Sequence, residues 1–156
     1  VGKVNTAYKA LHDYFSEKEN TAPSLQEVFD AVCAIRRSKL PNPREIGNAG
    51  SFFKNPIVDL EKYKALKEKY PTLPRFTVGI NSIKIPAAWL IENLGYKGTT
   101  RADANGAKYG VHAKQPLVLV NYGGASGAAI LSLAHEIQER VQEKFDIGLE
   151  MEVNII

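Results

Sequence analysis

The sequence predicts a single α+β domain spanning residues 1–156, with a mixed β-sheet packed against helices. Three observations lead to this class. Helical and extended patterns are mixed without a strict β-α rhythm, no internal repeat occurs, and 156 residues suffice for one hydrophobic core. We therefore expect short strands and helices to share one core.

The first forty residues predict a short strand at 1–5 followed by two helices. Residues 8–15 carry apolar side chains at three- and four-residue steps, as in a short helix. Ser24-Leu25-Gln26-Glu27 is a capping box, which starts the second helix. The expected inward stripe of that helix is Leu25, Val28, Phe29, Val32 and Ile35.

The connection from Lys39 to Pro56 combines three prolines with two glycines. Prolines fix the backbone dihedral φ, and glycines permit positive φ values. This composition predicts a rigid loop that holds a few polar groups, above all Ser51, in one geometry.

Beyond this loop, the patterns predict three helices and several short strands. Helices are expected at 59–70, 87–94 and 126–145, and extended segments at 75–78, 82–85, 117–120 and 149–156. Residues 97–114 show little periodicity and are interpreted as a loop. In the last strand, alternation places Glu150 and Glu152 on the face opposite the apolar row.

Composition excludes several classes of protein. Hydrophobic residues make up 44% of the chain and no apolar run approaches membrane-spanning length, so we expect no membrane insertion. The single cysteine, Cys33, indicates a reduced, cytoplasmic protein, and with only three scattered histidines we expect no metal site. The net charge of +3 comes from interleaved charges, which favours a small anionic ligand over nucleic acid. Because the chain starts on Val1, we expect an excised domain of a longer protein.

Ser51 is the first candidate for chemistry, because it lies between Gly50 and two anchoring rings, Phe52 and Phe53. A turn serine that satisfies nearby backbone groups is the alternative. The nucleophile-elbow pattern Gly-x-Ser-x-Gly is absent, so a chemical role would be proton donation rather than nucleophilic attack. Glu150 and Glu152 are candidates for a general acid or an electrostatic partner, and periodicity alone does not choose between them.

Cations on both sides of Ser51 suggest an anionic ligand. They are Arg36, Arg37, Lys39 and Lys54. A solvated helix end would carry the same residues. Asn55, Gln115 and Asn121 would suit orienting hydrogen bonds. Gly123, Gly124 and Gly127 lack the Gly-x-Gly-x-x-Gly spacing, so we expect no dinucleotide fingerprint here.

Several blocks of this sequence resemble one family in order along nearly the whole chain. These are Lys39-Leu40-Pro41, the run Gly47-Asn48-Ala49-Gly50-Ser51-Phe52-Phe53-Lys54-Asn55-Pro56, residues 88–98, residues 115–121 and residues 149–153. They are similar to the C-terminal, substrate-binding domain of the UDP-N-acetylenolpyruvoylglucosamine reductase (MurB) family. The resemblance implies that family's two-layer α+β fold.

The resemblance also implies a function. The family reduces UDP-N-acetylenolpyruvoylglucosamine to UDP-N-acetylmuramate in cytoplasmic peptidoglycan synthesis, with NADPH reducing a bound FAD. It implies that Ser51 donates a proton to the substrate carbon and that Glu152, rather than Glu150, is the catalytic glutamate. The substrate-binding residues implied are Tyr8, Arg36, Lys39, Asn55 and Gln115. The family's FAD-binding domains would precede Val1, so we expect this chain alone to bind neither FAD nor NADPH tightly.

Two rival functions remain at this stage. The chain could be a stand-alone nucleotide-sugar or anion-binding module without catalysis, in which case Ser51 and Glu152 would be dispensable. Nucleic-acid binding is suggested only by the basic isoelectric point and the tyrosines.

Overall fold

The computed structural model describes residues 8–156, so the strand expected at 1–5 lies outside the described residues. The chain divides into two compact units, with the boundary between Leu40 and Pro41. Each unit has its own cluster of buried hydrophobic side chains.

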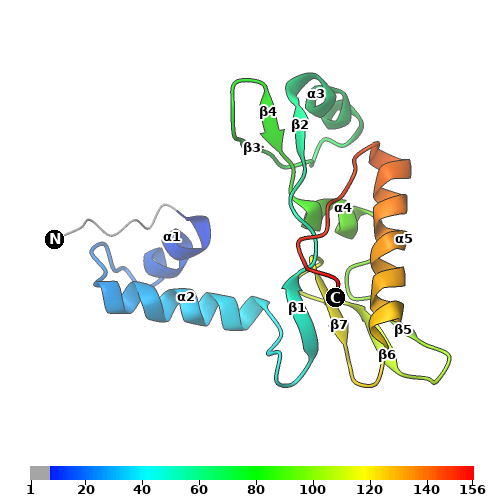
Figure 1. Cartoon of the computed structure of the whole chain (residues 1–156). Helices are drawn as coiled ribbons and strands as arrows, with labels where there is room; N and C mark the ends of the chain where they lie inside the picture. The colour runs from blue at the N-terminus through cyan, green and yellow to red at the C-terminus, as the bar shows by residue number, and fades with distance from the viewer. Residues whose placement is uncertain (1–7) are drawn as a thin grey trace. The chain divides into compact units, whose positions relative to one another are not determined.

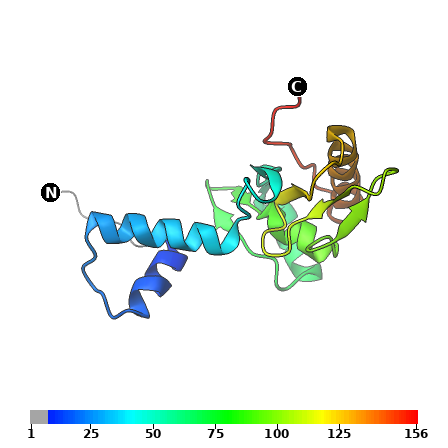
Figure 2. The ribbon, with the colours of Figure 1, turned by 90° about the horizontal axis from the view of Figure 1, so that it is seen from below.

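The N-terminal unit is a pair of helices, α1 (Lys9–Ser16) and α2 (Leu25–Lys39), which pack against each other (Figure 2). The capping box is confirmed: the Ser24 hydroxyl accepts a hydrogen bond from the Glu27 N–H, and the Glu27 carboxylate accepts one from the Ser24 N–H at 2.8 Å. The Ser24 N–H and the Ser24 hydroxyl both donate to the Glu27 carboxylate, which lowers the pKa of Glu27.

The stripe expected on α2 is only partly correct. Val28, Val32 and Ile35 pack against the cluster of this unit, but Leu25 and Phe29 are 73% and 63% exposed. The physical reason is size: the eight residues of α1 cover only part of a helix of fifteen residues.

The C-terminal unit contains two β-sheets (Figure 1). The first has the order β1-β7-β6-β5, with bounds β1 (Gly47–Ser51), β5 (Thr100–Ala102), β6 (Lys108–Val111) and β7 (Val118–Asn121). The second has the order β2-β4-β3, with bounds β2 (Ile57–Asp59), β3 (Phe76–Thr77) and β4 (Ser82–Lys84).

The α+β class is confirmed, but the sheets are not mixed. Within the described residues every strand pairing is antiparallel. The connections β5–β6 and β6–β7 are short, whereas parallel neighbours need a crossover of a dozen or more residues.

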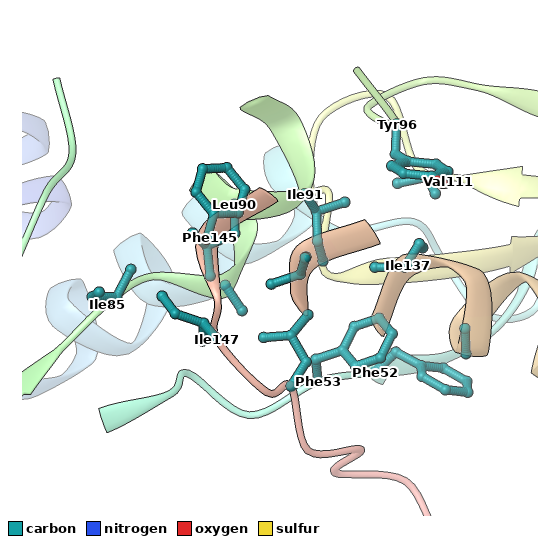
Figure 3. Close-up of a cluster of buried hydrophobic side chains, with 14 of the residues drawn as sticks. Phe52, Phe53, Ile85, Leu90, Ile91, Tyr96, Val111, Ile137, Phe145 and Ile147 are labelled. Atoms are coloured by element: carbon teal, nitrogen blue, oxygen red, sulfur yellow. The ribbon is translucent and has the colours of Figure 1, made fainter. Parts of the chain in front are cut away.

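Three helices complete the C-terminal unit: α3 (Leu60–Lys69), α4 (Ala87–Asn93) and α5 (Gly127–Phe145). All three were expected at these positions. Helix α5 packs against β6 and β7, and α4 packs against α5. The core between them includes fully buried side chains from several elements, among them Phe53, Ile85, Leu90, Ile137 and Phe145 (Figure 3).

Three segments differ from expectation. Residues 97–114, expected to be a loop, contain β5 and β6, and the expected loop 39–56 contains β1. The strand expected at 149–156 is reduced to an isolated bridge between Met151 and Phe53. None of the helices in residues 8–156 is long and apolar enough to cross a membrane.

Candidate functional site

Ser51 is the last residue of β1 and is exposed. The register of β1 against β7 shifts between Asn48 and Ser51, so the strand carries an irregularity just before the serine. Gly50 has a φ of 75° there, which glycine adopts without strain. The Asn48 side chain fixes this turn, because its oxygen accepts from the Gly50 N–H at 3.0 Å and its amide donates to the Ile46 carbonyl at 2.8 Å.

Two buried rings anchor the chain directly after Ser51. Phe52 and Phe53 are 5% and 1% exposed, and their ring centroids lie 5.3 Å apart (Figure 3). The Phe52 N–H also donates to the Leu117 carbonyl at 2.7 Å. Ser51 is thus held between a glycine turn and two anchors, the geometry expected from the sequence.

The C-terminal segment lies antiparallel beside residues 52–54. The Lys54 N–H donates to the Glu150 carbonyl, and the Glu152 N–H donates to the Phe52 carbonyl, both at 2.9 Å. The bridge between Phe53 and Met151 lies between these two bonds. The backbone of Glu152 is therefore bonded to the residue that follows Ser51, although one hundred positions separate the two in sequence.

The two glutamates differ in their surroundings. Glu150 forms an ion pair with the Lys54 ammonium. Among the residues that the structure describes, none forms a hydrogen bond or ion pair with the Glu152 carboxylate. Both side chains are exposed, so Glu152 is the one whose carboxylate is open to a ligand. The alternation of residues in the sequence alone had not distinguished Glu150 from Glu152.

Asn55 and Gln115 also lie in the C-terminal unit. The Asn55 side-chain oxygen accepts from the N–H of Ala87, the first residue of α4, at 2.9 Å, so Asn55 has a structural role. Gln115 belongs to the turn before β7, where its N–H donates to His112 Nδ1 at 3.2 Å. Burial, with a smaller contribution from Lys114, lowers the pKa of His112, which favours the neutral ring that this bond requires.

Tyr8, Arg36 and Lys39 belong to the N-terminal unit, and all three are exposed. The Tyr8 carbonyl accepts from two N–H groups in the first turn of α1, those of Leu11 and His12. Arg36 and Lys39 lie in the last turn of α2, where cations are favoured by the helix dipole. That these three residues bind the same ligand as Asn55 and Gln115 stays a prediction.

A cavity of about 660 Å³ lies along β1. Its walls come from β1, the start of α5 and the C-terminal segment, and include Asn48, Phe52, Leu119, Asn121, Ile130 and Val153. Among the residues 8–156, none with a charged side chain lines this cavity. The importance of Asn48 was missed from sequence, although an asparagine two residues before a glycine is a recognisable turn signal.

The glycines before α5 do not form a dinucleotide site. The strand before them, β7, belongs to an antiparallel sheet, whereas the fingerprint requires a parallel β-α-β unit. The Asn121 side-chain oxygen already accepts from the Gly123 and Ala125 N–H groups, at 2.9 and 3.3 Å. The residues of this turn therefore do not fit FAD or NADPH. Among the described residues, no group of three or more His, Cys, Asp or Glu side chains is placed to hold a metal ion.

The C-terminal unit is thus an α+β domain that presents a hydroxyl and a carboxylate from two hydrogen-bonded segments. Residues 42–156, nearly this whole unit, match the family model described as UDP-N-acetylenolpyruvoylglucosamine reductase, C-terminal domain. The chain belongs to this family.

Curated relatives extend the similarity to the N-terminal unit. A UDP-N-acetylenolpyruvoylglucosamine reductase of Flavobacterium johnsoniae is 45% identical over 99% of the chain, and that of Amoebophilus asiaticus is 50% identical over 97%. The Porphyromonas gingivalis protein of the same name is 50% identical over 96%. The chain spans only 44%, 43% and 42% of the lengths of these three relatives, respectively.

Proposed function

We propose that this chain is the substrate-binding part of a UDP-N-acetylenolpyruvoylglucosamine reductase, an oxidoreductase that forms UDP-N-acetylmuramate for peptidoglycan synthesis. The main support is the pairing of residues 52–54 with residues 150–152, which places Ser51 and Glu152 on neighbouring segments of a domain of this family.

Ser51 is proposed as the proton donor. Reduction of the enolpyruvyl group adds a hydride to its terminal carbon, and the carbon next to it then takes a proton. The Ser51 hydroxyl supplies this proton, leaving an alkoxide that takes a proton from water before the next turnover. Serine is a very weak acid, so its placement matters more than its acidity. The glycine turn on one side and the buried rings on the other provide that placement.

Glu152 is proposed as the second catalytic group, as a general acid or as an electrostatic partner of the reacting centre. The carboxylate is exposed, and its backbone is held by the Phe52 carbonyl. Its neighbour Glu150 is engaged by Lys54, which favours Glu152 for this role.

The UDP-sugar is proposed to be bound by Tyr8, Arg36, Lys39, Asn55 and Gln115. The cations Arg36 and Lys39 suit a diphosphate, which carries negative charge that these side chains neutralise. Asn55 keeps its amide N–H₂ group for the ligand, because only its oxygen caps α4. The side chain of Gln115 is half-buried beside the strand that pairs with Ser51.

In the full-length enzyme, a bound FAD would supply the hydride, with NADPH as its reductant. Because the residues before α5 do not fit a dinucleotide, we propose that FAD-binding domains outside this chain hold the cofactor, and that they are its partner in forming the complete site. The proposed location of the enzyme is the cytoplasm, where UDP-sugar precursors of peptidoglycan are made.

The test is Ser51→Ala in the full-length protein. Flavin reduction by NADPH should stay near the wild-type rate, because it precedes the protonation step. Product formation should slow by about 10²- to 10⁴-fold, the usual contribution of a positioned acid. Stopped-flow absorbance of the flavin separates the two half-reactions.

Ser132→Ala is a matched control, since Ser132 is an exposed serine on α5 and belongs to neither of the two paired segments that carry Ser51 and Glu152. It should leave both half-reactions unchanged. Wild-type product formation by Ser51→Ala would rule out the proposed role of Ser51.

A further inference from the structure

Lys54 and Glu150 form an ion pair beside the two candidate catalytic groups. Lys54 follows Ser51 by three residues, and Glu150 precedes Glu152 by two. The side chains of the pair are 51% and 72% exposed. An ion pair this exposed contributes little to stability, so it calls for another explanation.

The backbone places both glutamates within reach of the same cation. In an extended segment, residues two apart project from the same face, roughly 7 Å from each other. The Lys54 N–H is bonded to the Glu150 carbonyl, so Lys54 lies opposite Glu150, and Glu152 lies opposite Phe52. The lysine side chain is long and flexible, and so it can reach either carboxylate.

We propose that Glu150 is a positioning residue, whose carboxylate holds the Lys54 ammonium away from Glu152. The Glu152 carboxylate thereby stays unpaired and available to the reacting group beside Ser51. Without the Glu150 carboxylate, Lys54 would pair with Glu152 and draw it along the segment. This inference rests on the proposed function of Glu152.

The test is a double-mutant cycle in the full-length enzyme. Glu150→Gln should lower kcat by about tenfold with little change in KM, a size within the range of coupling between contacting residues. The double variant Glu150→Gln/Lys54→Gln should regain the kcat of Lys54→Gln alone, because no ammonium is left to capture Glu152. Raising the ionic strength should restore part of the kcat of Glu150→Gln, since exposed pairs are screened by salt.

A purely structural role for Glu150 predicts a different pattern. The loss of kcat caused by Glu150→Gln would then persist in the Lys54→Gln background and would not respond to salt. Each of these two observations would overturn the proposal. Wild-type kcat in Glu150→Gln would overturn it as well. Glu143→Gln is the matched control, because Glu143 is also an exposed, ion-paired glutamate, bonded to Arg140 on α5. It should leave kcat unchanged.

Glu152→Gln, measured in parallel, separates this inference from the proposed function. Wild-type turnover in Glu152→Gln would remove the catalytic role of Glu152 itself. A strong loss in Glu152→Gln combined with normal turnover in Glu150→Gln would overturn only the role of Glu150.

Discussion

The Arg101 guanidinium on β5 donates two hydrogen bonds of 2.6 Å to the Glu136 carboxylate on α5. The Tyr96 hydroxyl donates a third, also at 2.6 Å, to the same carboxylate. The Arg101 group lies 5.9 Å from the centre of the Tyr96 ring. These contacts tie β5, one of the two edge strands of the four-stranded sheet, to helix α5.

Stability should depend on pH through this cluster. The bonds from Arg101 and Tyr96 lower the pKa of Glu136 from 4.5 to about 2. A carboxylate whose pKa is lowered by folding stabilises the protein above its unfolded value, so this contribution should be lost as the pH falls from 4.5 towards 2. Burial, followed by the bond to Glu136, raises the pKa of Tyr96 from 10.0 to about 12. Its contribution should be lost as the pH rises from 10 towards 12.

Arg101→Met should weaken the acid dependence and lower the free energy of unfolding by about 1 kcal/mol at neutral pH, a small value because both charged groups are more than one-third exposed. Fluorescence of Trp89, the single tryptophan of the chain, reports unfolding of the C-terminal unit. Glu139→Gln on the same helix is the control and should change neither the stability nor its pH dependence. If the free energy of unfolding of Arg101→Met depended on acid pH as strongly as that of the wild type, the prediction would be contradicted.

Gly110→Ala should disrupt the β5–β6 hairpin. A Cβ at this position would lie 2.0 Å from the Thr99 carbonyl oxygen and 3.0 Å from the Thr100 Cα, both backbone atoms of the paired segment. Such overpacking costs about 1–3 kcal/mol or more, measurable as a lower denaturant midpoint. Gly127→Ala is the comparison, since a Cβ at the first residue of α5 meets nothing within 4 Å. Equal midpoints for the two variants would be inconsistent with this account.

Two substitutions of Asn55 should separate its structural role from its proposed role in binding. Asn55→Asp keeps an oxygen for the Ala87 N–H and removes the amide donor. It should therefore keep the wild-type Tm but raise KM for the UDP-sugar in the full-length enzyme. Asn55→Ala removes the cap as well and should lower Tm in addition, by an amount that corresponds to about 1 kcal/mol. A normal KM in Asn55→Asp would show that the amide does not bind substrate.

Phe53→Ala should lower the free energy of unfolding by about 3–5 kcal/mol, because this side chain is only 1% exposed and leaves a cavity. Phe76→Ala should change it by less than about 0.5 kcal/mol, because Phe76 is 59% exposed. Chemical denaturation of both variants gives the comparison. Similar losses would mean that Phe53 is not an essential part of the core.

Helices were the most predictable part of this fold. Helices α2, α3 and α5 begin at capping side chains, those of Ser24, Asp59 and Ser126, and the caps of α2 and α5 were recognised in the sequence. Their signals are local: one side chain accepts a hydrogen bond from a backbone group three residues later. Burial along α2 was less predictable, since it depends on how much of its surface a short partner helix covers.

Strands were less predictable, for a physical reason visible in β1. Its sequence, Gly-Asn-Ala-Gly-Ser, contains no β-branched or aromatic residue, and the segment is extended because β7 pairs with it. In β5 the inward position is held by the charged residue Arg101, and in β6 one of the buried positions is Gly110, so neither strand shows the apolar alternation that would reveal it. In β1, pairing with the distant strand β7 overrides weak local preference.

The candidate site was likewise predictable only where it depends on residues adjacent in sequence. The anchoring of Ser51 between Gly50 and two rings was predictable, because all of these residues are adjacent in sequence. The position of Glu152 beside them depends on a pairing between residues about one hundred positions apart, which no local pattern specifies. Family resemblance selected Glu152 over Glu150, and the Lys54 ion pair gives an independent physical reason to distinguish them.

The pairing of the C-terminal segment with residues 52–54 also separates activity from folding. Two backbone hydrogen bonds flank a single bridge there, and the side chains of Met151 and Val153 are only partly buried against the core. Such a segment can open locally at a small fraction of the free energy of global unfolding. Substitution of the exposed Glu152 should therefore impair the proposed turnover while leaving the melting curve unchanged, and a thermal-shift screen would classify such a variant as intact.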